Sequence, residues 1–302
     1  MMLLDGKAAQ DAIKQKLAKE VQKRTRPPVL AIIQIGDRAE SNAYIERKKK
    51  FGETIGVTVS VLRLQDDVAE SVIEGHIQRL NQEIEVDGIL LQLPIPKELD
   101  RTRLIDGILP AKDVDGLTST QIASRGRGEL RAVIPATARG VLELLTFYNI
   151  PISGKKIAVL GRSALVGTPT ADVLRQNGGL VTVCHSKTPN TQEISLESDI
   201  IVVAIGRPKF LTHKYVRSDG TQTIVDVGIN AVTETGEERL EDQVLLNSSD
   251  KAQGNKLVGD VDFEDVQSIV HSISPVPGGV GPMTVTALFE NLLEISKKHQ
   301  EY

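Results

Sequence analysis

The stretch that decides the fold is "IAVLGRSALVGTPTADVL", residues 157 to 174. An apolar run predicts a buried strand that ends at Gly161, and after Gly167 the pattern predicts a helix over 168–178. A strand, a glycine turn and a helix start in this order aim backbone N–H groups at a phosphate, as in dinucleotide-binding βαβ units. Ser163 stands where the usual fingerprint has a second glycine, so the turn alone is equally consistent with a plain tight connection.

Strand-like and helix-like stretches alternate along nearly the whole chain. Apolar runs predict strands over 29–36, 57–64, 86–94, 154–161, 180–186, 199–206, 222–230 and 255–261. Helical patterns occur at 41–56, 70–82, 135–150, 168–178 and 284–299. Because parallel strands are joined by helical crossovers, the sequence predicts an α/β fold with parallel sheets covered on both faces.

The length of 302 residues allows two domains of ordinary size. The helix over 135–150 is expected to join the two halves, and the last helix is expected to pack back on the first. The predicted first domain is therefore discontinuous and comprises residues 1–134 plus 284–302. The second domain, residues 135–283, is expected to be of the Rossmann type.

Composition limits the class of protein. The chain is 40% hydrophobic and carries a net charge of -4, with few aromatic residues, so no nucleic-acid partner is expected. No apolar run reaches the roughly 18 residues that a membrane helix needs, and Asp5 comes too early for a signal-peptide core. The single cysteine, Cys184, fits a reducing compartment. A cytoplasmic protein without a membrane or metal site is the expectation.

The end of the second predicted strand of the Rossmann unit indicates which dinucleotide binds. An NAD site usually has a carboxylate about 20 residues after the glycine turn, but here the strand ends in Cys184, His185 and Ser186. Arg162 is placed to pair with a 2′-phosphate, and Ser186 and Lys187 add donors. The alternative is that Arg162 is a solvated loop cation. NADP is favoured over NAD.

The stretch "SNAYIERKKK", residues 41–50, holds four cations in ten positions. On a helix, Tyr44, Lys48 and Phe51 share one stripe with Ser41 and Ile55, so Lys48 falls on the apolar side. The other cations of the run fit a solvated face. A lysine near the protein interior has a lowered pKa and can move a proton at neutral pH, although a lysine can also snorkel from such a position.

Three further stretches carry unusual polar or glycine-rich patterns. Gln92 interrupts the apolar run "LLQLPIP", where a buried amide needs partners. Asp113 and Asp115 precede a glycine turn, a position where most aspartates only cap backbone amides. The stretch "PVPGGVGPMT", residues 275–284, either brings bare backbone close to a ligand or forms a rigid hinge.

These stretches together resemble the bifunctional methylenetetrahydrofolate dehydrogenase/cyclohydrolase family. The matching elements, in the family's order, are "SNAYIERKKKFGETIG", "DGILLQLPIP", "KDVDG", "VLGRSALVGTP", "CHSKT", "IVDVGIN", "GDVDF" and "PVPGGVGPMT". They cover the chain from residue 41 to 284. Two departures stand out: "LTSTQIASRG" follows "KDVDG" where the family usually has Phe-His-Pro and an Asn, and Ala136 and Ala138 replace a cysteine and a proline.

The resemblance implies a two-domain enzyme whose α/β domains flank a cleft. The first domain binds folate, and the enzyme couples NADP-dependent oxidation of 5,10-methylenetetrahydrofolate to hydrolysis of the methenyl product into 10-formyltetrahydrofolate. It also implies a homodimer in one-carbon metabolism that supplies purine and amino-acid biosynthesis. The catalytic residues it implies are Lys48, Tyr44, Gln92 and Asp115. The implied substrate-binding residues are Tyr44, Asp115, Pro277, Gly278 and Gly279, and the cofactor-binding residues are Gly161, Arg162, Ser163, Gly167, His185, Ser186 and Ile229.

Three alternatives remain at this point. One is a monofunctional dehydrogenase with weak hydrolysis, which the altered loop after "KDVDG" favours somewhat and which Lys48 with Gln92 opposes. Another is a different two-domain NADP dehydrogenase of the shikimate type, which gives no reason for "PVPGGVGPMT". The last is a non-enzymatic NADP- or folate-binding module.

Overall fold

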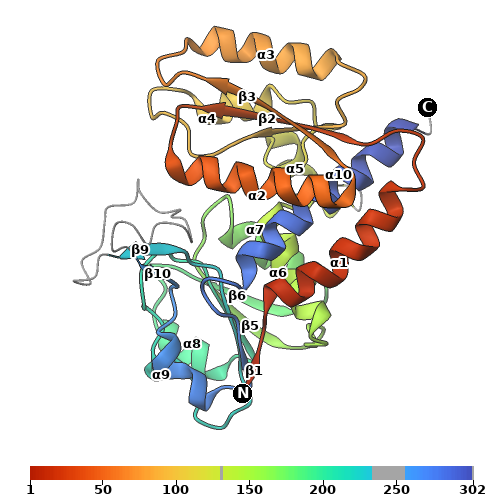
Figure 1. Cartoon of the computed structure of the whole chain (residues 1–302). Coiled ribbons are helices and arrows are strands. Elements are labelled where there is room, and N and C mark those ends of the chain that lie inside the picture. Colours follow the sequence, from red (N-terminus) through yellow and green to blue (C-terminus); the bar gives the residue numbers. More distant parts are fainter. Residues whose placement is uncertain (130–131, 233–255, 301–302) are drawn as a thin grey trace. The chain divides into compact units, whose positions relative to one another are not determined.

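The computed structural model describes residues 1–129, 132–232 and 256–300. The chain forms two compact units (Figure 1). The three-stranded unit contains Asp11–Ala136 and Val285–Tyr302, and the six-stranded unit contains Met1–Gln10 and Thr137–Thr284. The first ten residues thus belong to the six-stranded unit, whereas the sequence placed them in the predicted first domain. The reason is that β1 (Met2–Leu3) pairs in parallel with β11 (Ser272–Ile273).

The three-stranded unit is built on a parallel sheet of order β3-β2-β4. Its strands are β2 (Val29–Ile35), β3 (Thr58–Leu64) and β4 (Gly88–Leu91). Its helices are α1 (Gly6–Val21, which begins in the other unit), α2 (Ala39–Ile55), α3 (Glu70–Gln82), α4 (Arg101–Asp106) and α5 (Ser119–Gly126). Strands β2 and β3 and helices α2 and α3 lie where the sequence predicts them.

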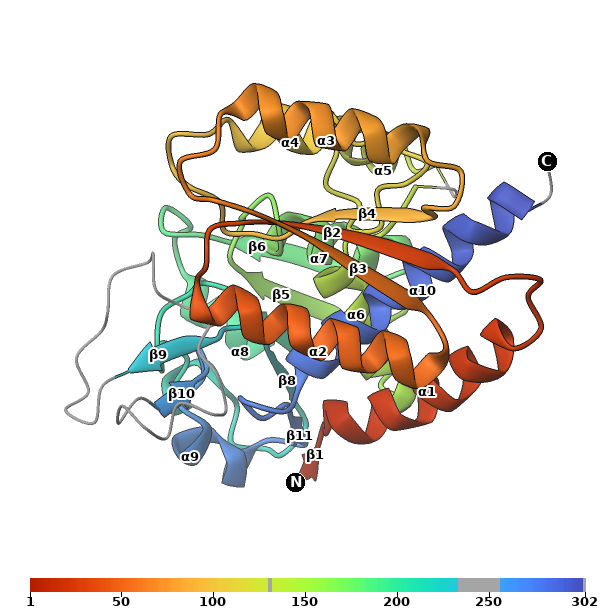
Figure 2. The ribbon, with the colours of Figure 1, turned by 45° about the horizontal axis from the view of Figure 1, so that its top comes forward.

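Alternate residues of β2 face opposite cores, which explains why the strand reads as a continuous apolar run. Leu30 and Ile32 pack with α2 and α10 (Val280–Gln300), whereas Ile33 packs with α3 and α4. Figure 2 shows α3 and α4 above the sheet and α2 below it. The sheet is therefore covered on both faces, as predicted.

The C-terminal helix α10 supplies a large part of this core. Phe289 is fully buried, and its ring centroid lies 5.1 Å from that of Phe51 on α2. The residues from Val285 onward belong to the three-stranded unit, so that unit is discontinuous in sequence.

Truncation of Phe289 to alanine is expected to lower the free energy of unfolding by about 3–5 kcal/mol, because it leaves a large cavity in a closed core. Urea denaturation measures this loss. The matched control is Phe147→Ala, since Phe147 is 39% exposed and leaves no closed cavity. Equal losses in the two variants would contradict the packing described for α10.

The six-stranded unit contains a parallel sheet of order β1-β11-β8-β7-β5-β6. Its inner strands are β5 (Lys156–Leu160), β6 (Leu180–Cys184), β7 (Ile200–Val203) and β8 (Thr223–Asp226). Its helices are α6 (Ala136–Phe147, starting at the unit boundary), α7 (Gly167–Gln176), α8 (Thr191–Glu197), α9 (Phe263–Val266) and the 3₁₀ turns η1 (His213–Tyr215) and η4 (Gln267–Ile269). The predicted Rossmann-type order of strands and helices is present.

The end of the predicted strand series differs from the structure. The strand expected over 222–230 stops at Asp226, and β9 (Asn230–Val232) instead pairs antiparallel with β10 (Lys256–Val258) in a separate two-stranded sheet. The strand expected over 255–261 begins at a residue outside the described range and is this short β10. The edge of the main sheet comes from β11 and β1, whose two-residue length gives no apolar run to recognise.

Candidate active site

Lys48 lies on the inner face of α2, and the prediction that it faces inward is confirmed. Its side chain is only 9% exposed, and Ser41, Phe51 and Ile55 on the same stripe are also buried. Arg47 and Lys50 are exposed, and Lys49 forms an ion pair with Glu46. The helix ends because Gly56 adopts a left-handed conformation (φ 84°) and its N–H bonds to the preceding turn.

Gln92 fixes the position of the Lys48 amine. Lys48 Nζ donates a hydrogen bond to Gln92 Oε1 at 2.7 Å. The amide of Gln92 is oriented by its other end, since Nε2 donates to the carbonyl oxygen of Leu93 at 2.6 Å. Gln92 directly follows β4 and is 7% exposed. The two side chains therefore meet at the carboxyl edge of the three-stranded sheet.

Asp113 and Asp115 have different roles although they are two residues apart. The carboxylate of Asp113 accepts hydrogen bonds from the N–H groups of Gly116 and Thr118, each at 2.8 Å, so it closes the turn. Asp115 is half-buried and accepts a backbone hydrogen bond from Ala136. Asp113 is thus the structural aspartate of the pair, and Asp115 is the one whose charge acts on Lys48.

Burial governs the protonation of both groups. Desolvation lowers the pKa of Lys48 to about 8, and the negative charge of Asp115 opposes this shift. Desolvation likewise raises the pKa of Asp115 to about 6, opposed by Lys48 and reinforced by Asp113. A fraction of Lys48 is therefore neutral at physiological pH, and this fraction can accept a proton.

Tyr44 lies one helical turn before Lys48 and is half-buried. Burial raises the pKa of its hydroxyl, and the positive charge of Arg47 opposes the rise. The Arg47 guanidinium carbon lies 5.4 Å from the centre of the Tyr44 ring. One side of the ring is thus engaged by a cation, and the phenol stays protonated.

The glycine turn after β5 has the tight geometry that a dinucleotide phosphate requires. Gly161 has φ 121°, and a Cβ there would lie 2.1 Å from the carbonyl oxygen of Ala204. A Cβ on Gly167 would lie 2.4 Å from the Gly161 carbonyl oxygen. Only glycine fits at these two positions, and α7 begins directly after the turn. The residues present therefore fit a bound dinucleotide.

Ser163 performs the task of a helix cap at this turn. Its Oγ accepts hydrogen bonds from the N–H groups of Val166 (3.3 Å) and Gly167 (3.2 Å) at the start of α7. A hydroxyl that accepts these bonds keeps its own proton for an outside acceptor. Both Arg162 and Ser163 are exposed.

The end of β6 lies beside this turn, since the Gly161 N–H donates to the Cys184 carbonyl at 2.9 Å. His185 Nδ1 accepts a hydrogen bond from the Lys187 N–H at 3.1 Å, which leaves Ser186 exposed between them. Arg162 and Ser186 therefore follow two adjacent strands at their carboxyl ends.

The remaining predicted residues lie in the six-stranded unit. Ile229 is half-buried in the loop after β8. In the Pro277–Gly279 segment, the Gly278 carbonyl accepts a hydrogen bond from the Gly6 N–H at 2.8 Å. A Cβ on Gly6 would lie 1.7 Å from the Gly279 carbonyl oxygen, so Gly6 is a supporting residue that the sequence reading missed. The only feature of the sequence that could have indicated this role is the position of Gly6 at the start of α1.

The structure thus groups the predicted residues into two sets. Tyr44, Lys48, Gln92 and Asp115 belong to the three-stranded unit, and the other predicted residues belong to the six-stranded unit. Two buried carboxylates of the six-stranded unit, Asp226 and Asp260, lie in the recognised stretches "IVDVGIN" and "GDVDF" without a predicted role.

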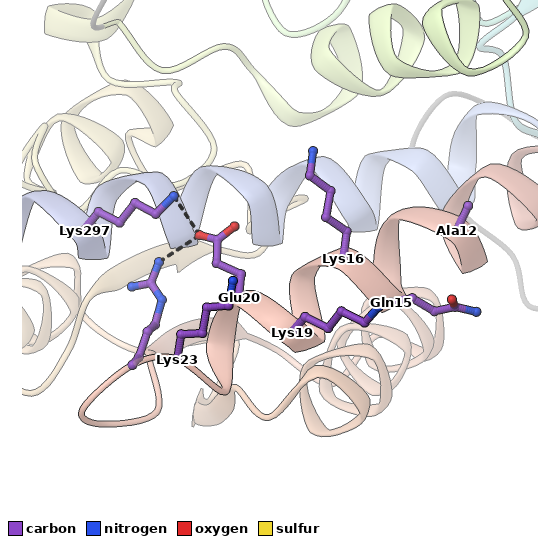
Figure 3. A pocket seen from close by; sticks show the side chains of 8 residues that line it. Ala12, Gln15, Lys16, Lys19, Glu20, Lys23 and Lys297 are labelled. Atoms are coloured by element: carbon purple, nitrogen blue, oxygen red, sulfur yellow. Dashed lines mark hydrogen bonds and ion pairs between the residues drawn. The ribbon is translucent and has the colours of Figure 1, made fainter.

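A separate hollow of about 770 Å³ opens between α1 and α10 (Figure 3). It is lined by Ala12, Gln15, Lys16, Lys19, Glu20, Lys23, Arg24 and Lys297. Its acidic member, Glu20, is held by Lys297 at 2.9 Å and Arg24 at 3.2 Å. None of the predicted site residues lines this basic hollow.

Within the described part of the chain, no helix has the length and apolar character needed to cross a bilayer. Across the same residues, no group of three or more His, Cys, Asp or Glu side chains is arranged to hold a metal ion.

Comparison with known proteins gives two family matches that together span most of the chain. The tetrahydrofolate dehydrogenase/cyclohydrolase catalytic domain matches residues 4–115, and the NAD(P)-binding domain of the same family matches residues 135–300. The bifunctional protein FolD of Porphyromonas gingivalis is 40% identical over 98% of this chain and 97% of its own length.

Solved structures agree with these matches. The bifunctional FolD of Campylobacter jejuni is 35% identical with a TM-score of 0.87, and 99% of each chain is covered. The Trypanosoma brucei FolD, complexed with NADP cofactor and an inhibitor, is 32% identical with a TM-score of 0.88, covering 100% of this chain and 99% of that one.

Proposed function

The chain belongs to the tetrahydrofolate dehydrogenase/cyclohydrolase family, and from this premise we propose that Lys48, Gln92, Asp115 and Tyr44 form its catalytic site. The enzyme oxidises 5,10-methylenetetrahydrofolate with NADP and hydrolyses the 5,10-methenyl product to 10-formyltetrahydrofolate. The observation that carries the residue assignment is the 2.7 Å hydrogen bond from the buried Lys48 amine to Gln92. It lies in the unit that contains residues 11–115 of the catalytic-domain match.

In the hydrolysis, water adds to the electrophilic amidinium carbon of the methenyl compound. Neutral Lys48 takes one proton from the attacking water as the new C–O bond forms. The resulting ammonium gives a proton to the pterin nitrogen while its bond to that carbon breaks. The hydroxyl proton leaves to solvent as the formyl C=O forms, so one proton is released overall.

The neighbours of Lys48 set its position and its charge. Gln92 holds the amine in place, because its own amide is anchored to the Leu93 carbonyl. Asp115 accepts hydrogen bonds from the pterin of the folate and stabilises the ammonium form of Lys48. Tyr44 supplies a flat apolar face for the substrate one turn along the helix. Pro277, Gly278 and Gly279 contribute bare backbone to substrate binding.

The oxidation needs no acid or base from the protein. Bound here, NADP would supply the hydride acceptor for this oxidation. Gly161 and Gly167 let the backbone approach the pyrophosphate, and Ile229 contacts the cofactor farther along the sheet. Arg162, Ser163 and Ser186 hold the 2′-phosphate, with His185 keeping the loop after β6 in shape. These residues bind and orient the cofactor.

A two-step spectroscopic assay tests the function. Methylenetetrahydrofolate and NADP should yield NADPH, and the methenyl absorbance should then decay faster than in buffer alone. The absence of both signals would contradict the assignment. NADPH formation without enzymatic decay would instead indicate a monofunctional dehydrogenase.

The rate of methenyl hydrolysis is expected to rise with pH, to reach half its maximum near pH 8 and to level off above it. The pKa of Lys48 is lowered to about 8, so below that pH its neutral fraction falls about tenfold per pH unit. The measurement is the enzymatic rate between pH 6 and 9, after subtraction of the buffer rate. A flat profile over this range would contradict the role of Lys48 as a base.

We further propose a cytoplasmic homodimer that supplies one-carbon units to purine and amino-acid biosynthesis. The support for pairing through the six-stranded unit is its edge strand β6, where Leu180 is 61% exposed and where, among the residues that the structure describes, no strand pairs on the outer side. A single cysteine, Cys184, fits the reducing compartment.

A further inference from the structure

Two buried carboxylates, Asp226 and Asp260, lie at the carboxyl edge of the six-stranded sheet and have no part in the mechanism above. They are 3% and 0% exposed. We infer that Asp226 and Asp260 are positioning residues that shape the binding surface for the nicotinamide half of NADP. This inference rests on the proposed function, because it concerns the same cofactor.

Asp260 ties together two loops that follow neighbouring strands. Its Oδ2 accepts hydrogen bonds from the N–H groups of Ile205 (2.7 Å) and Gly206 (2.8 Å), just after β7. Its Oδ1 accepts a hydrogen bond from Asn230 Nδ2 at 2.8 Å, after β8. One carboxylate thus fixes both loops relative to each other.

Asp226 in turn holds the segment that carries Asp260. Its Oδ1 accepts hydrogen bonds from the N–H groups of Gly228 and Asp260, each at 3.0 Å, and its Oδ2 accepts one from Val261 at 2.9 Å. The N–H of Asp226 donates to Ser274 Oγ at 2.8 Å. The two aspartates therefore act in series and link three loops with Ser274, the residue that follows β11.

Two glycines make room for this arrangement. A Cβ on Gly228 would lie 2.2 Å from the carboxyl carbon of Asp260, and a Cβ on Gly259 would lie 1.8 Å from Asp226 Oδ2. The carboxylate of Asp260 thus occupies the space that a side chain at Gly228 would need, and the carboxylate of Asp226 occupies the space that a side chain at Gly259 would need. This explains why a glycine lies close to each aspartate in "DVG" and "GDV".

The strand order indicates which part of the cofactor these loops meet. In the order β6-β5-β7-β8, the glycine turn after β5 takes the pyrophosphate, and the end of β6 takes the 2′-phosphate side. The ends of β7 and β8, on the other side of β5, are then left for the nicotinamide half. Ile229 lies between Gly228 and Asn230, which bond to Asp226 and Asp260 respectively.

The test measures the affinity of the full-length wild type and of its variants for two ligands, NADP and adenosine 2′,5′-bisphosphate. Asp260→Asn keeps the shape but presents an N–H₂ group to at least one donor, so it loses a charge-assisted bond. We expect NADP to bind at least about tenfold more weakly, whereas adenosine 2′,5′-bisphosphate, which lacks the nicotinamide half, binds as in the wild type. Hydrolysis of supplied methenyltetrahydrofolate, which uses no cofactor, should stay unchanged.

The matched control is Asp262→Asn, two residues away, whose carboxylate pairs with Lys209 at the surface and should leave both affinities unchanged. If Asp260→Asn does not fold by circular dichroism, Asn230→Ala carries the test, because it removes one donor to Asp260. Equal weakening of both ligands, or unchanged NADP binding, would overturn the inference. If the wild-type enzyme forms no NADPH, it is the proposed function that fails.

Discussion

Replacement of Lys48 by methionine is expected to lower the rate of methenyltetrahydrofolate hydrolysis about 100- to 10,000-fold, the range that a positioned acid–base group contributes. Methionine retains an apolar chain that fills the same site on α2. It carries no amine, so the attacking water has no proton acceptor and the departing nitrogen has no donor. Decay of the methenyl absorbance measures the loss directly.

The fold and the binding of NADP should survive this change. Stability is expected to change only modestly, because the desolvation cost of the amine disappears while Gln92 Oε1 loses its donor. Oxidation of methylenetetrahydrofolate should be affected far less than hydrolysis, since hydride transfer moves no proton. Thermal unfolding and a titration with NADP serve as the checks.

Lys49→Met provides the matched control for this experiment. Lys49 is the next residue on α2, and it pairs with Glu46 at the surface instead of facing the core. Its replacement removes the same charge from the same helix and should leave both activities intact. Hydrolysis that is unchanged in Lys48→Met, or equally reduced in both variants, would refute the role of Lys48.

Replacement of Arg162 by alanine is expected to weaken NADP binding about 10- to 100-fold and to change NAD binding little. A charge-assisted hydrogen bond contributes about 1.5–3 kcal/mol, and only NADP carries the 2′-phosphate that accepts one from this guanidinium. Comparing kcat/KM for the two cofactors measures the change in selectivity.

Arg175→Ala is the control, because Arg175 lies at the other end of α7 and pairs with Asp172 at 3.1 Å. That variant should keep the preference of the wild type for NADP. If Arg162→Ala weakens NADP and NAD equally, the guanidinium does not recognise the 2′-phosphate and acts only on the turn.

The inward direction of Lys48 was predictable because a helix repeats its faces every 3.6 residues, and "SNAYIERKKK" places apolar neighbours on only one of them. Strands β5, β6 and β7 and the glycine turn of the six-stranded unit were predictable from their apolar runs and glycine positions. Long apolar runs and glycines in tight turns determine the local structure directly, so no knowledge of tertiary contacts is needed to predict it.

Long-range pairing was not predictable in the same way. Strands β1 and β11 have two residues each, and β1 exists only because segments about 270 positions apart meet. The difference between Asp113 and Asp115 depends on which N–H groups the turn presents, and alternation in sequence does not encode it. Lys112 illustrates the same limit: it is buried, but it caps α3 by donating to the carbonyl oxygens of Leu80 and Glu83.

The claim that the Lys48 amine is buried and has a lowered pKa is tested most directly by titrating this amine in the folded protein. Carbon-13 labelling of the lysine side chains and NMR spectroscopy over pH 6 to 11 would follow each amine, and the signal missing from Lys48→Met identifies this one. We predict a midpoint near 8. A midpoint near the ordinary lysine value of about 10.4 would show an amine in contact with bulk water and would contradict the mechanism.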